Sequence, residues 1–547
     1  MKNATIPIMI GVTGHRDLVV PEIIFDRCRN LLTDLLKNFP DTPLCVISAF
    51  AEGADQICAE AALASGAEIW GIIPFEEKAY LETFQTNAGR EKYLHLKSQA
   101  AHIIEINESP DSPEKYVKAG KFIVEHCNIL LAVWDGCDSK RPGGTRHIID
   151  LALNKYKYTP SVLAAECPVV PVIHLFAQRH RQSDSFILQN KPEDGELFAG
   201  TTLESMQKID KLENLKFIQQ MQQLNNFNRF VGLDFRKKNM NIPEDIEKEY
   251  ELSPWLERYT VSSNMATTFQ KKYNWQLKFL YIGGISGGMC VQIYGGIDLG
   301  RYLWGHYFLL GYLLLWGIMY CYWRFSHQSF HFRYLELRLM TQLLKNFIYL
   351  KLSGCSEHFW ERFSSQYSNN SVMITSALKY WSVLPEKKCE MTPETKSLLQ
   401  KIWIDGQIDY LSKKLSSAQK KIRSKVKVHY TLTFLAIMVP VYFLGDFYFG
   451  LSGAVYDWLR SVNGLLVALP LFTLAMIQFY YEQKNIEKTE KQFQEMLDNY
   501  IYIRNSFSMT DDAFLQQQLL SLSKASIKET TLWINIYIDS HPEVIKS

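Results

Sequence analysis

The chain has 547 residues, which is enough for two to four domains with buried cores. Its formal net charge of +2 excludes a globally basic nucleic-acid-binding protein, and no nucleic-acid partner is expected. The ten cysteines are scattered, with no Cys-x-x-Cys pair and no His/Cys cluster. We therefore expect no metal site, and we predict reduced thiols packed as small hydrophobic side chains. The N-terminus leads directly into a strand-like run, with no charged segment followed by a long apolar one, so no signal peptide is expected.

Short apolar runs alternate with amphipathic segments through residues 5–176. The predicted strands are Ile6–Val12, Leu44–Phe50, Ala67–Pro74, His102–Ile106, Asn128–Trp134 and Pro168–Leu175. The predicted helices between them are Glu22–Phe39, Ala54–Ser65, Pro113–Cys127 and Thr145–Tyr156. Because the strands are apolar on both faces, this alternation predicts a Rossmann-like α/β domain with a parallel sheet covered on both sides. Ligands of such sheets bind at the carboxyl ends of the strands.

Three loops at those strand ends combine glycine with polar side chains, namely residues 11–17, 48–55 and 135–145. Glycines allow the backbone to approach a ligand, helix-start amides suit phosphate, and Arg16 is able to add a bidentate phosphate contact. Taken singly, each loop is more often structural, with His15 a turn residue and Glu52 a helix-start charge. The candidate ligand-binding residues are Gly11, Thr13, Gly14, His15, Arg16, Ser48, Glu52, Gly53, Asp55, Asp135, Gly143, Gly144, Thr145 and Arg146.

These loops resemble the SLOG superfamily, which includes the Lonely guy phosphoribohydrolases and the DprA proteins. The resemblance rests on G-x-T-G-H-R at residues 11–16, S-x-x-A-E-G-A-D at 48–55 and P-G-G-T at 142–145. It implies a site for nucleotides or nucleotide-sugar phosphates. The phosphoribohydrolase pattern P-G-G-x-G-T-x-x-E ends in a catalytic glutamate, whereas Ile148 stands three positions after Thr145 and Asp150 lies out of register. We therefore expect no catalytic residue, and Arg146 is a candidate partner for a second phosphate.

Four long apolar runs follow in the second half of the chain. They are Phe279–Ile297, Tyr302–Trp323, Val428–Gly445 and Asn463–Tyr481, and none contains a charged residue. Their lengths approach those of transmembrane helices, which predicts an all-α region with four spans. Lysine and arginine flank the two hairpins on one side, so the positive-inside rule predicts a multi-pass protein of the bacterial inner membrane with both termini and the central connector in the cytoplasm.

The predicted organisation has five parts. Residues 1–180 form the SLOG-like domain, 181–278 a helical coupling segment, 279–353 the first two-span hairpin with a cytoplasmic helix, 354–427 a cytoplasmic helical connector, and 428–547 the second hairpin with cytoplasmic C-terminal helices. Within the coupling segment, Leu203–Asn226 has a helical pattern. The layout resembles the two-span effector domains that accompany SLOG domains in bacterial anti-phage systems.

These resemblances imply a defence effector that binds a nucleotide second messenger, such as a cyclic ADP-ribose isomer or a cyclic oligonucleotide. The expected partners are the signalling nucleotide, the lipid bilayer, further copies of the chain and a separate enzyme that makes the signal, and no cofactor is expected. One alternative is a membrane-tethered nucleotide or NAD glycohydrolase, whose carboxylate would be Glu52, Asp55, Asp135 or Asp150. Another is a transporter or channel with a regulatory nucleotide domain, which the uncharged runs disfavour.

Overall fold

The computed structural model describes residues 4–112, 114–138, 141–153, 169–180, 192–203, 205–209, 211–231, 240, 242–296, 305–325, 330–356, 359–360, 371–387, 389–449, 470–478, 481, 486–507 and 511–540. The chain divides into two compact units. Unit 1 contains Met1–Lys238, Glu251–Val261 and Ser356–Lys388, and unit 2 contains Asn239–Tyr250, Ser262–Cys355 and Cys389–Ser547.

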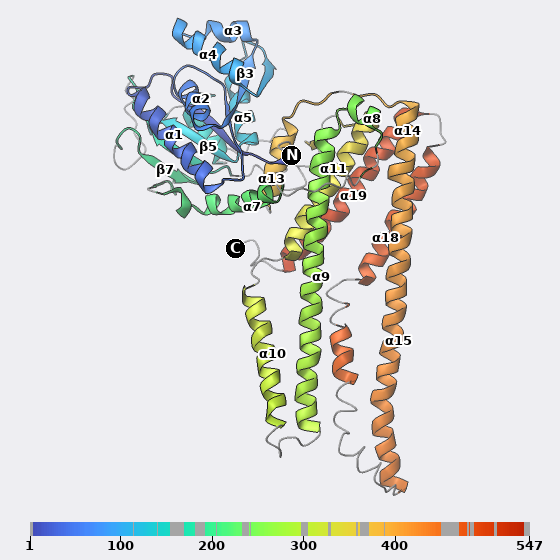
Figure 1. The fold of residues 1–547 in the computed structure, drawn as a ribbon. Helices are drawn as coiled ribbons and strands as arrows, with labels where there is room; N and C mark the ends of the chain where they lie inside the picture. The colour runs from blue at the N-terminus through green and yellow to red at the C-terminus, as the bar shows by residue number, and fades with distance from the viewer. Residues whose placement is uncertain are drawn as a thin grey trace. The chain divides into compact units, whose positions relative to one another are not determined.

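Unit 1 is built on an eight-stranded sheet with the order β4-β3-β2-β1-β5-β6-β7-β8 (Figure 1). The strands are β1 (Ile8–Gly14), β2 (Leu44–Ser48), β3 (Glu68–Phe75), β4 (His102–Glu108), β5 (Ile129–Trp134), β6 (Val172–Phe176), β7 (Leu197–Gly200) and β8 (Gln207–Lys208). Strands β1 to β6 pair in parallel, which confirms the predicted parallel sheet and all six predicted strands. Strands β7 and β8 extend one edge in antiparallel fashion and were not predicted.

The helices of unit 1 connect these strands as a parallel sheet requires. They are α1 (Pro21–Asn38), α2 (Ala54–Ser65), α3 (Glu77–Glu82), α4 (Asn87–Gln99), α5 (Lys115–His126), α6 (Thr145–Ala152), α7 (Lys216–Val231) and α13 (Val372–Ser382). Every residue of β2, β5 and β6 is buried, as expected for strands covered on both faces. Residues of Leu203–Asn226 form β8 and part of α7, so the helical pattern there was only partly right.

Two segments from later in the chain are fixed to the amino-terminal side of this sheet. The amide of Asn228 in α7 donates to the carbonyl of Ile6 at 2.8 Å and accepts from the Ile6 N–H at 2.9 Å, as a neighbouring strand would. In α13, the hydroxyl of Ser376 accepts from Asn128 at 2.8 Å, and the Lys379 ammonium donates to the carbonyl of Cys127. Buried hydrogen bonds of this kind stabilise a specific docking position.

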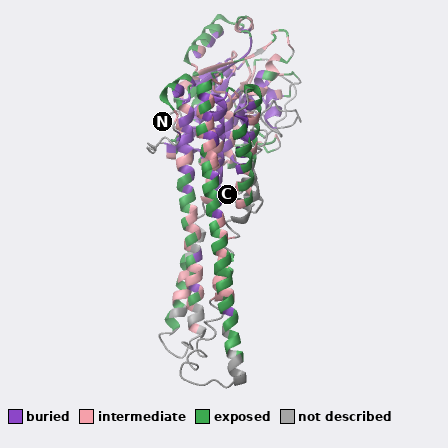
Figure 2. Ribbon diagram, turned by 90° about the vertical axis from the view of Figure 1, so that its right-hand side faces the viewer, coloured by how far each residue is buried: buried purple, intermediate pink, exposed green. Residues whose placement is uncertain are grey.

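Unit 2 is helical. Its described elements include α8 (Glu244–Glu249), α9 (Ser253–Gly296), α10 (Gly305–Phe325), α11 (Phe330–Leu352), α14 (Pro393–Leu399), a π-helical turn (Gln400–Asp405), α15 (Gly406–Phe449), α18 (Ile486–Ser506) and α19 (Asp512–Ser540). The first residues of α9 belong to unit 1. Helix α11 packs against α19, and α15 packs against α18. Exposed and intermediate residues (green and pink) alternate along much of the long helices in Figure 2.

The prediction of four membrane-spanning helices is wrong for the part of the chain that the structure describes. There, no helix combines the length with the apolar character that crossing a bilayer requires. The predicted multi-pass location in the inner membrane depended on those spans and is therefore contradicted as well. The fourth predicted run, Asn463–Tyr481, lies largely outside the described residues.

The error has a physical reason. The prediction of four spans relied on the absence of charged residues from the runs. The hydropathy of a helix also depends on how many of its uncharged residues are aliphatic. Helix α10, which holds the described part of the second run, is rich in Tyr, Trp and Gly and has His306 as its second residue. The run at the end of α9 contains several glycines. Helices α9 and α15 are each 44 residues long and continue through lysine-bearing segments.

Candidate functional site

The strand order identifies where a ligand would bind. From the central β1 the chain moves outward through β2, β3 and β4, then returns to β5 on the other side of β1. The order therefore reverses between β1 and β5. In open parallel sheets, ligands bind outside the carboxyl ends of the strands at such a switch point. The candidate loops after β1 and β5 both lie there.

Two glycines allow the loops after β1 and β2 to pack directly on each other. A Cβ on Gly53, whose φ is +87°, would lie 2.4 Å from the carbonyl oxygen of Arg16. A Cβ on Gly14 would lie 2.3 Å from the Cβ of Ala54. The N–H of Ala54, at the start of α2, donates to the carbonyl of His15 at 3.0 Å. These two glycines therefore position the β1 loop, and the first amide of α2 is already occupied.

His15 and Asp135 meet across the switch point. Nε2 of His15 lies 3.0 Å from Oδ1 of Asp135, and both side chains are about nine-tenths buried. The same oxygen accepts from the backbone N–H of Cys137 at 3.0 Å, which fixes the turn after β5. Burial raises the pKa of Asp135, but the interaction with His15, the N–H of Cys137 and the charge of Arg179 outweigh it, so the pKa lies below its usual value. The carboxylate is therefore ionised at neutral pH.

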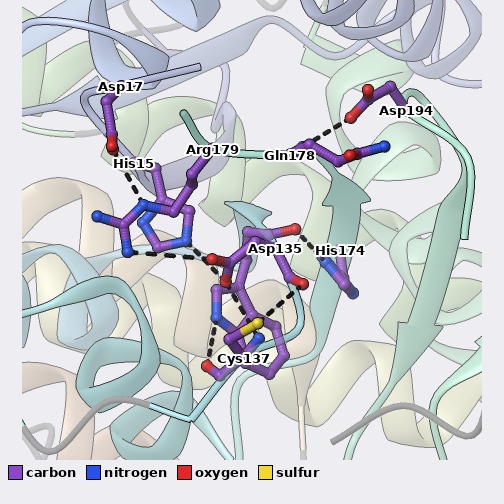
Figure 3. Close-up of polar contacts among 9 residues, drawn as sticks. His15, Asp17, Asp135, Cys137, His174, Gln178, Arg179 and Asp194 are labelled. Atoms are coloured by element: carbon purple, nitrogen blue, oxygen red, sulfur yellow. Dashed lines mark hydrogen bonds and ion pairs between the residues drawn. The ribbon is translucent and has the colours of Figure 1, made fainter. Parts of the chain in front are cut away.

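Arg179 and Asp17 complete this group (Figure 3). Nε of Arg179, just after β6, lies 3.0 Å from Oδ1 of Asp17, and its Nη1 lies 3.9 Å from Oδ2 of Asp135. Leu18 and Arg179 also form an isolated antiparallel bridge. We call His15, Asp17, Asp135 and Arg179 the switch-point site. Each of its two carboxylates lies next to a basic side chain, Asp17 next to Arg179 and Asp135 next to His15.

His174 lies beneath this site in β6 and is fully buried. Its Nε2 is 2.9 Å from the carbonyl oxygen of Trp134, so this nitrogen carries the hydrogen and donates it. Burial lowers the pKa of His174 to about 4, which makes the ring neutral at pH 7. Its Nδ1 has no hydrogen-bond partner among the described residues. His174 therefore adds no charge below the switch-point site.

Glu52 has a structural role. Its carboxylate accepts from the backbone N–H groups of Gln85 and Thr86 at 2.7 and 2.9 Å, and from the Thr86 hydroxyl at 2.8 Å. Burial raises the pKa of Glu52, but these hydrogen bonds outweigh it and the pKa lies below its usual value. The carboxylate thus holds the loop that leads into α4.

Asp55 is buried at the start of α2 near the same loop. Burial raises the pKa of its carboxyl to about 7, against the opposing effects of Arg16 and of hydrogen bonds with Ala51, Ser48 and Ala49. Ser48 itself is fully buried at the end of β2, and its hydroxyl accepts from the N–H of Phe50 at 3.2 Å. Both side chains shape the β2 loop from within.

The third predicted loop begins α6. Gly143 has φ +73°, and its lack of a side chain leaves room for Tyr116. A Cβ on Gly143 would lie 2.7 Å from the Cβ of Tyr116. Gly144 is the N-cap of α6, and the first turn contains no acidic residue. The backbone amides of Thr145 and Arg146 therefore lie at the positive end of the α6 dipole, which favours binding of an anion.

Arg146 does not extend outward from α6. It is 4% exposed, its Nε lies 2.9 Å from Oδ2 of Asp150, and its guanidinium lies 5.5 Å from the centre of the Trp134 ring. Its Nη1 has no hydrogen-bond partner among the residues that the structure describes. The phosphate contact expected of this side chain is thus replaced by a buried ion pair with Asp150.

Two further candidates lie within β1. Gly11 allows α5 to approach, because a Cβ there would lie 2.6 Å from the Ile123 side chain. Thr13 pairs with Ala132 in the parallel register of β1 and β5. Arg16 is exposed beyond β1, and its Nη1 donates to the carbonyl of Thr83 at 3.5 Å.

The structure brings His15, Asp135 and the start of α6 to one end of the sheet, and assigns Gly11, Glu52, Ser48 and Arg146 to internal contacts. Sequence reasoning missed Asp17 and Arg179, although Asp17 directly follows the G-x-T-G-H-R motif. Within the described ranges, no group of three His, Cys, Asp or Glu side chains is arranged to hold a metal ion. No protein-family model matches the sequence, and no curated protein matches it significantly.

Proposed function

We propose that unit 1 binds a nucleoside phosphate at the switch point and that the chain is a sensor of this nucleotide. The observation that carries the proposal is the meeting of His15 and Asp135, which follow adjacent strands on opposite sides of the strand-order reversal. Open parallel sheets use that position for nucleotides. The resemblance of residues 11–16, 48–55 and 142–145 to SLOG proteins supports the same ligand class.

The neighbouring groups suit the two parts of such a ligand. The amides at the start of α6 suit a phosphate, because no acidic residue occupies the first turn. The ionised carboxylate of Asp135 suits the hydroxyl groups of a ribose, which donate hydrogen bonds to an acidic residue in many dinucleotide sites. The phosphate would therefore lie over α6 and the sugar toward β5.

Binding without turnover is favoured by the residue that replaces the family's catalytic glutamate. Ile148 is buried at that position, where it packs against Gly120. A nucleotide or NAD glycohydrolase is the second candidate, because a carboxylate beside a histidine is suited to acid–base chemistry. Asp135 would be its carboxylate, since Glu52 and Asp150 are held by internal hydrogen bonds and ion pairs.

In a sensor, a separate enzyme would supply the nucleotide, and binding would have to favour one conformation or assembly of the chain. A ligand shifts such an equilibrium only by its difference in affinity for the two states. Helix α9 contributes residues to both units, so it offers a covalent route by which binding in unit 1 would reach unit 2.

The test is a thermal-shift panel on the full chain with AMP, ADP, ADP-ribose, cyclic ADP-ribose, NAD and cyclic dinucleotides. A compound at about 100 times its dissociation constant should stabilise the fold by about 2.7 kcal/mol. We expect His15→Ala to remove most of this stabilisation, and His95→Ala, on the exposed side of α4, to leave it unchanged.

The same samples are assayed for hydrolysis. Stabilisation without product would support the sensor. Product that disappears in Asp135→Asn would support the glycohydrolase instead. If no compound stabilised the wild-type chain, both proposals would be wrong.

A further inference from the structure

A second group of cations lies beside the switch-point site and is not used by it. The guanidinium of Arg16 is 5.9 Å from the centre of the Tyr116 ring, and the ammonium of Lys115 is 5.6 Å from the same ring. Lys115 also lies 4.8 Å from the centre of the Phe75 ring, which meets Tyr116 edge to face. Two positive side chains, one from the loop after β1 and one from α5, are therefore held around one aromatic ring.

The hydrogen bonds of these two cations go to uncharged groups. The polar contacts of Arg16 and Lys115 are with the neutral carbonyls of Thr83 and Pro110, and neither forms an ion pair with a described carboxylate. Of the two carboxyl groups whose pKa Arg16 lowers, Asp55 is buried and Glu52 is engaged by three hydrogen bonds. Lys115 is the first residue of α5 and follows the N-cap Glu114, and the first turn itself holds no acidic residue. A lysine at a helix start is unfavourable by itself, because the helix dipole is positive there.

This group adjoins the start of α6. The Cβ and backbone of Tyr116 fill the space that a side chain on Gly143 would need, so the loop that leads into α6 lies against the first turn of α5. A ligand phosphate at the α6 amides would therefore have Tyr116 and its two cations as neighbours. A phosphate is the ligand group whose charge is opposite to that of both Arg16 and Lys115.

We propose that Arg16, Lys115 and the Tyr116 ring form a second phosphate subsite, so that the ligand is a nucleoside diphosphate rather than a monophosphate. This inference rests on the proposed nucleotide site at the start of α6. It assigns the first phosphate to the α6 amides and the second to the two cations. Contact with the Tyr116 ring limits the motion of both cations.

The test compares ADP with AMP by isothermal titration calorimetry on the full chain, as wild type, Lys115→Gln and Lys118→Gln. Glutamine keeps a donor for the Pro110 carbonyl and removes only the charge. Lys118 is the control, because it lies on the same helix and pairs with Glu108 at 2.6 Å. We expect wild type to bind ADP about tenfold more tightly than AMP, and Lys115→Gln to lose that preference with AMP affinity unchanged. Lys118→Gln should behave as wild type.

The outcomes separate this subsite from the nucleotide site itself. Equal affinity for ADP and AMP in wild type would overturn the second subsite and leave nucleotide binding intact. Equal weakening of ADP and AMP in Lys115→Gln would also overturn it, because the lysine would then contact the phosphate that both share. No binding of either nucleotide by wild type would overturn the subsite together with the proposed function.

Discussion

Gly53→Ala should lower the free energy of unfolding by about 3 kcal/mol or more, and should displace the loop after β1. The glycine has φ +87°, and an added Cβ would lie 2.4 Å from the carbonyl oxygen and 2.5 Å from the Cα of Arg16. Neither atom belongs to a flexible side chain, so relief requires the β1 and β2 loops to separate. The measurement is the midpoint of urea denaturation of the full chain, with nucleotide binding measured alongside.

Gly66→Ala is the matched control. Gly66 ends α2 with φ +85°, but an added Cβ there would meet nothing within 4 Å. Alanine at this left-handed position, with ψ 15° rather than the −126° of Gly53, meets a smaller backbone strain and no collision, and should cost about 1 kcal/mol. If the two variants were equally destabilised, the close packing of the β1 and β2 loops would not be what Gly53 provides.

Asp55→Asn should remove a pH dependence of stability that extends from about pH 4 to about pH 7. Burial raises the pKa of Asp55 from 3.8 to about 7 in the folded chain. Below the unfolded pKa both states hold the proton, and the contribution is fully present. As pH rises toward 7 the unfolded chain loses the proton first, so stability falls until the folded carboxyl also ionises.

Relative to wild type, Asp55→Asn should therefore gain about 2–4 kcal/mol between pH 4 and pH 8, since each pKa unit corresponds to about 1.4 kcal/mol. Urea denaturation of both proteins at several pH values measures this. Asp34→Asn is the control, because Asp34 is 60% exposed on α1 and its loss should change little with pH. A difference between Asp55→Asn and wild type that stayed constant across this range would show that Asp55 is ionised in the folded chain throughout.

The parallel sheet could be predicted because local pattern decides it. Each of β1 to β6 is a short apolar run bounded by turn residues, and the glycine-bearing loops follow directly from the strand ends. Strands β7 and β8 were missed because they are short, partly exposed and at a sheet edge. The docking of α13 could not be predicted, since the contact between Asn128 and Ser376 joins residues 248 positions apart.

The candidate site could be predicted in its position but only partly in its residues. Spacing indicated which loops converge, because carboxyl ends of parallel strands share one edge. It could not indicate that Arg146 turns inward to Asp150 or that Glu52 binds the 85–86 backbone, since those partners are set by tertiary packing. Arg179 carried no local signal, because it becomes a site residue only through the pairing of its backbone with Leu18.

Hydrogen exchange of the full chain tests the central claim most directly, with and without the most stabilising compound of the thermal-shift panel. Nucleotide binding at the switch point predicts slower exchange in the segments 11–17, 133–138 and 141–147, which come together only in the folded sheet. Segments of β7 and β8 should exchange at unchanged rates. Protection confined to other segments, or none in these three, would contradict a nucleotide site at the switch point.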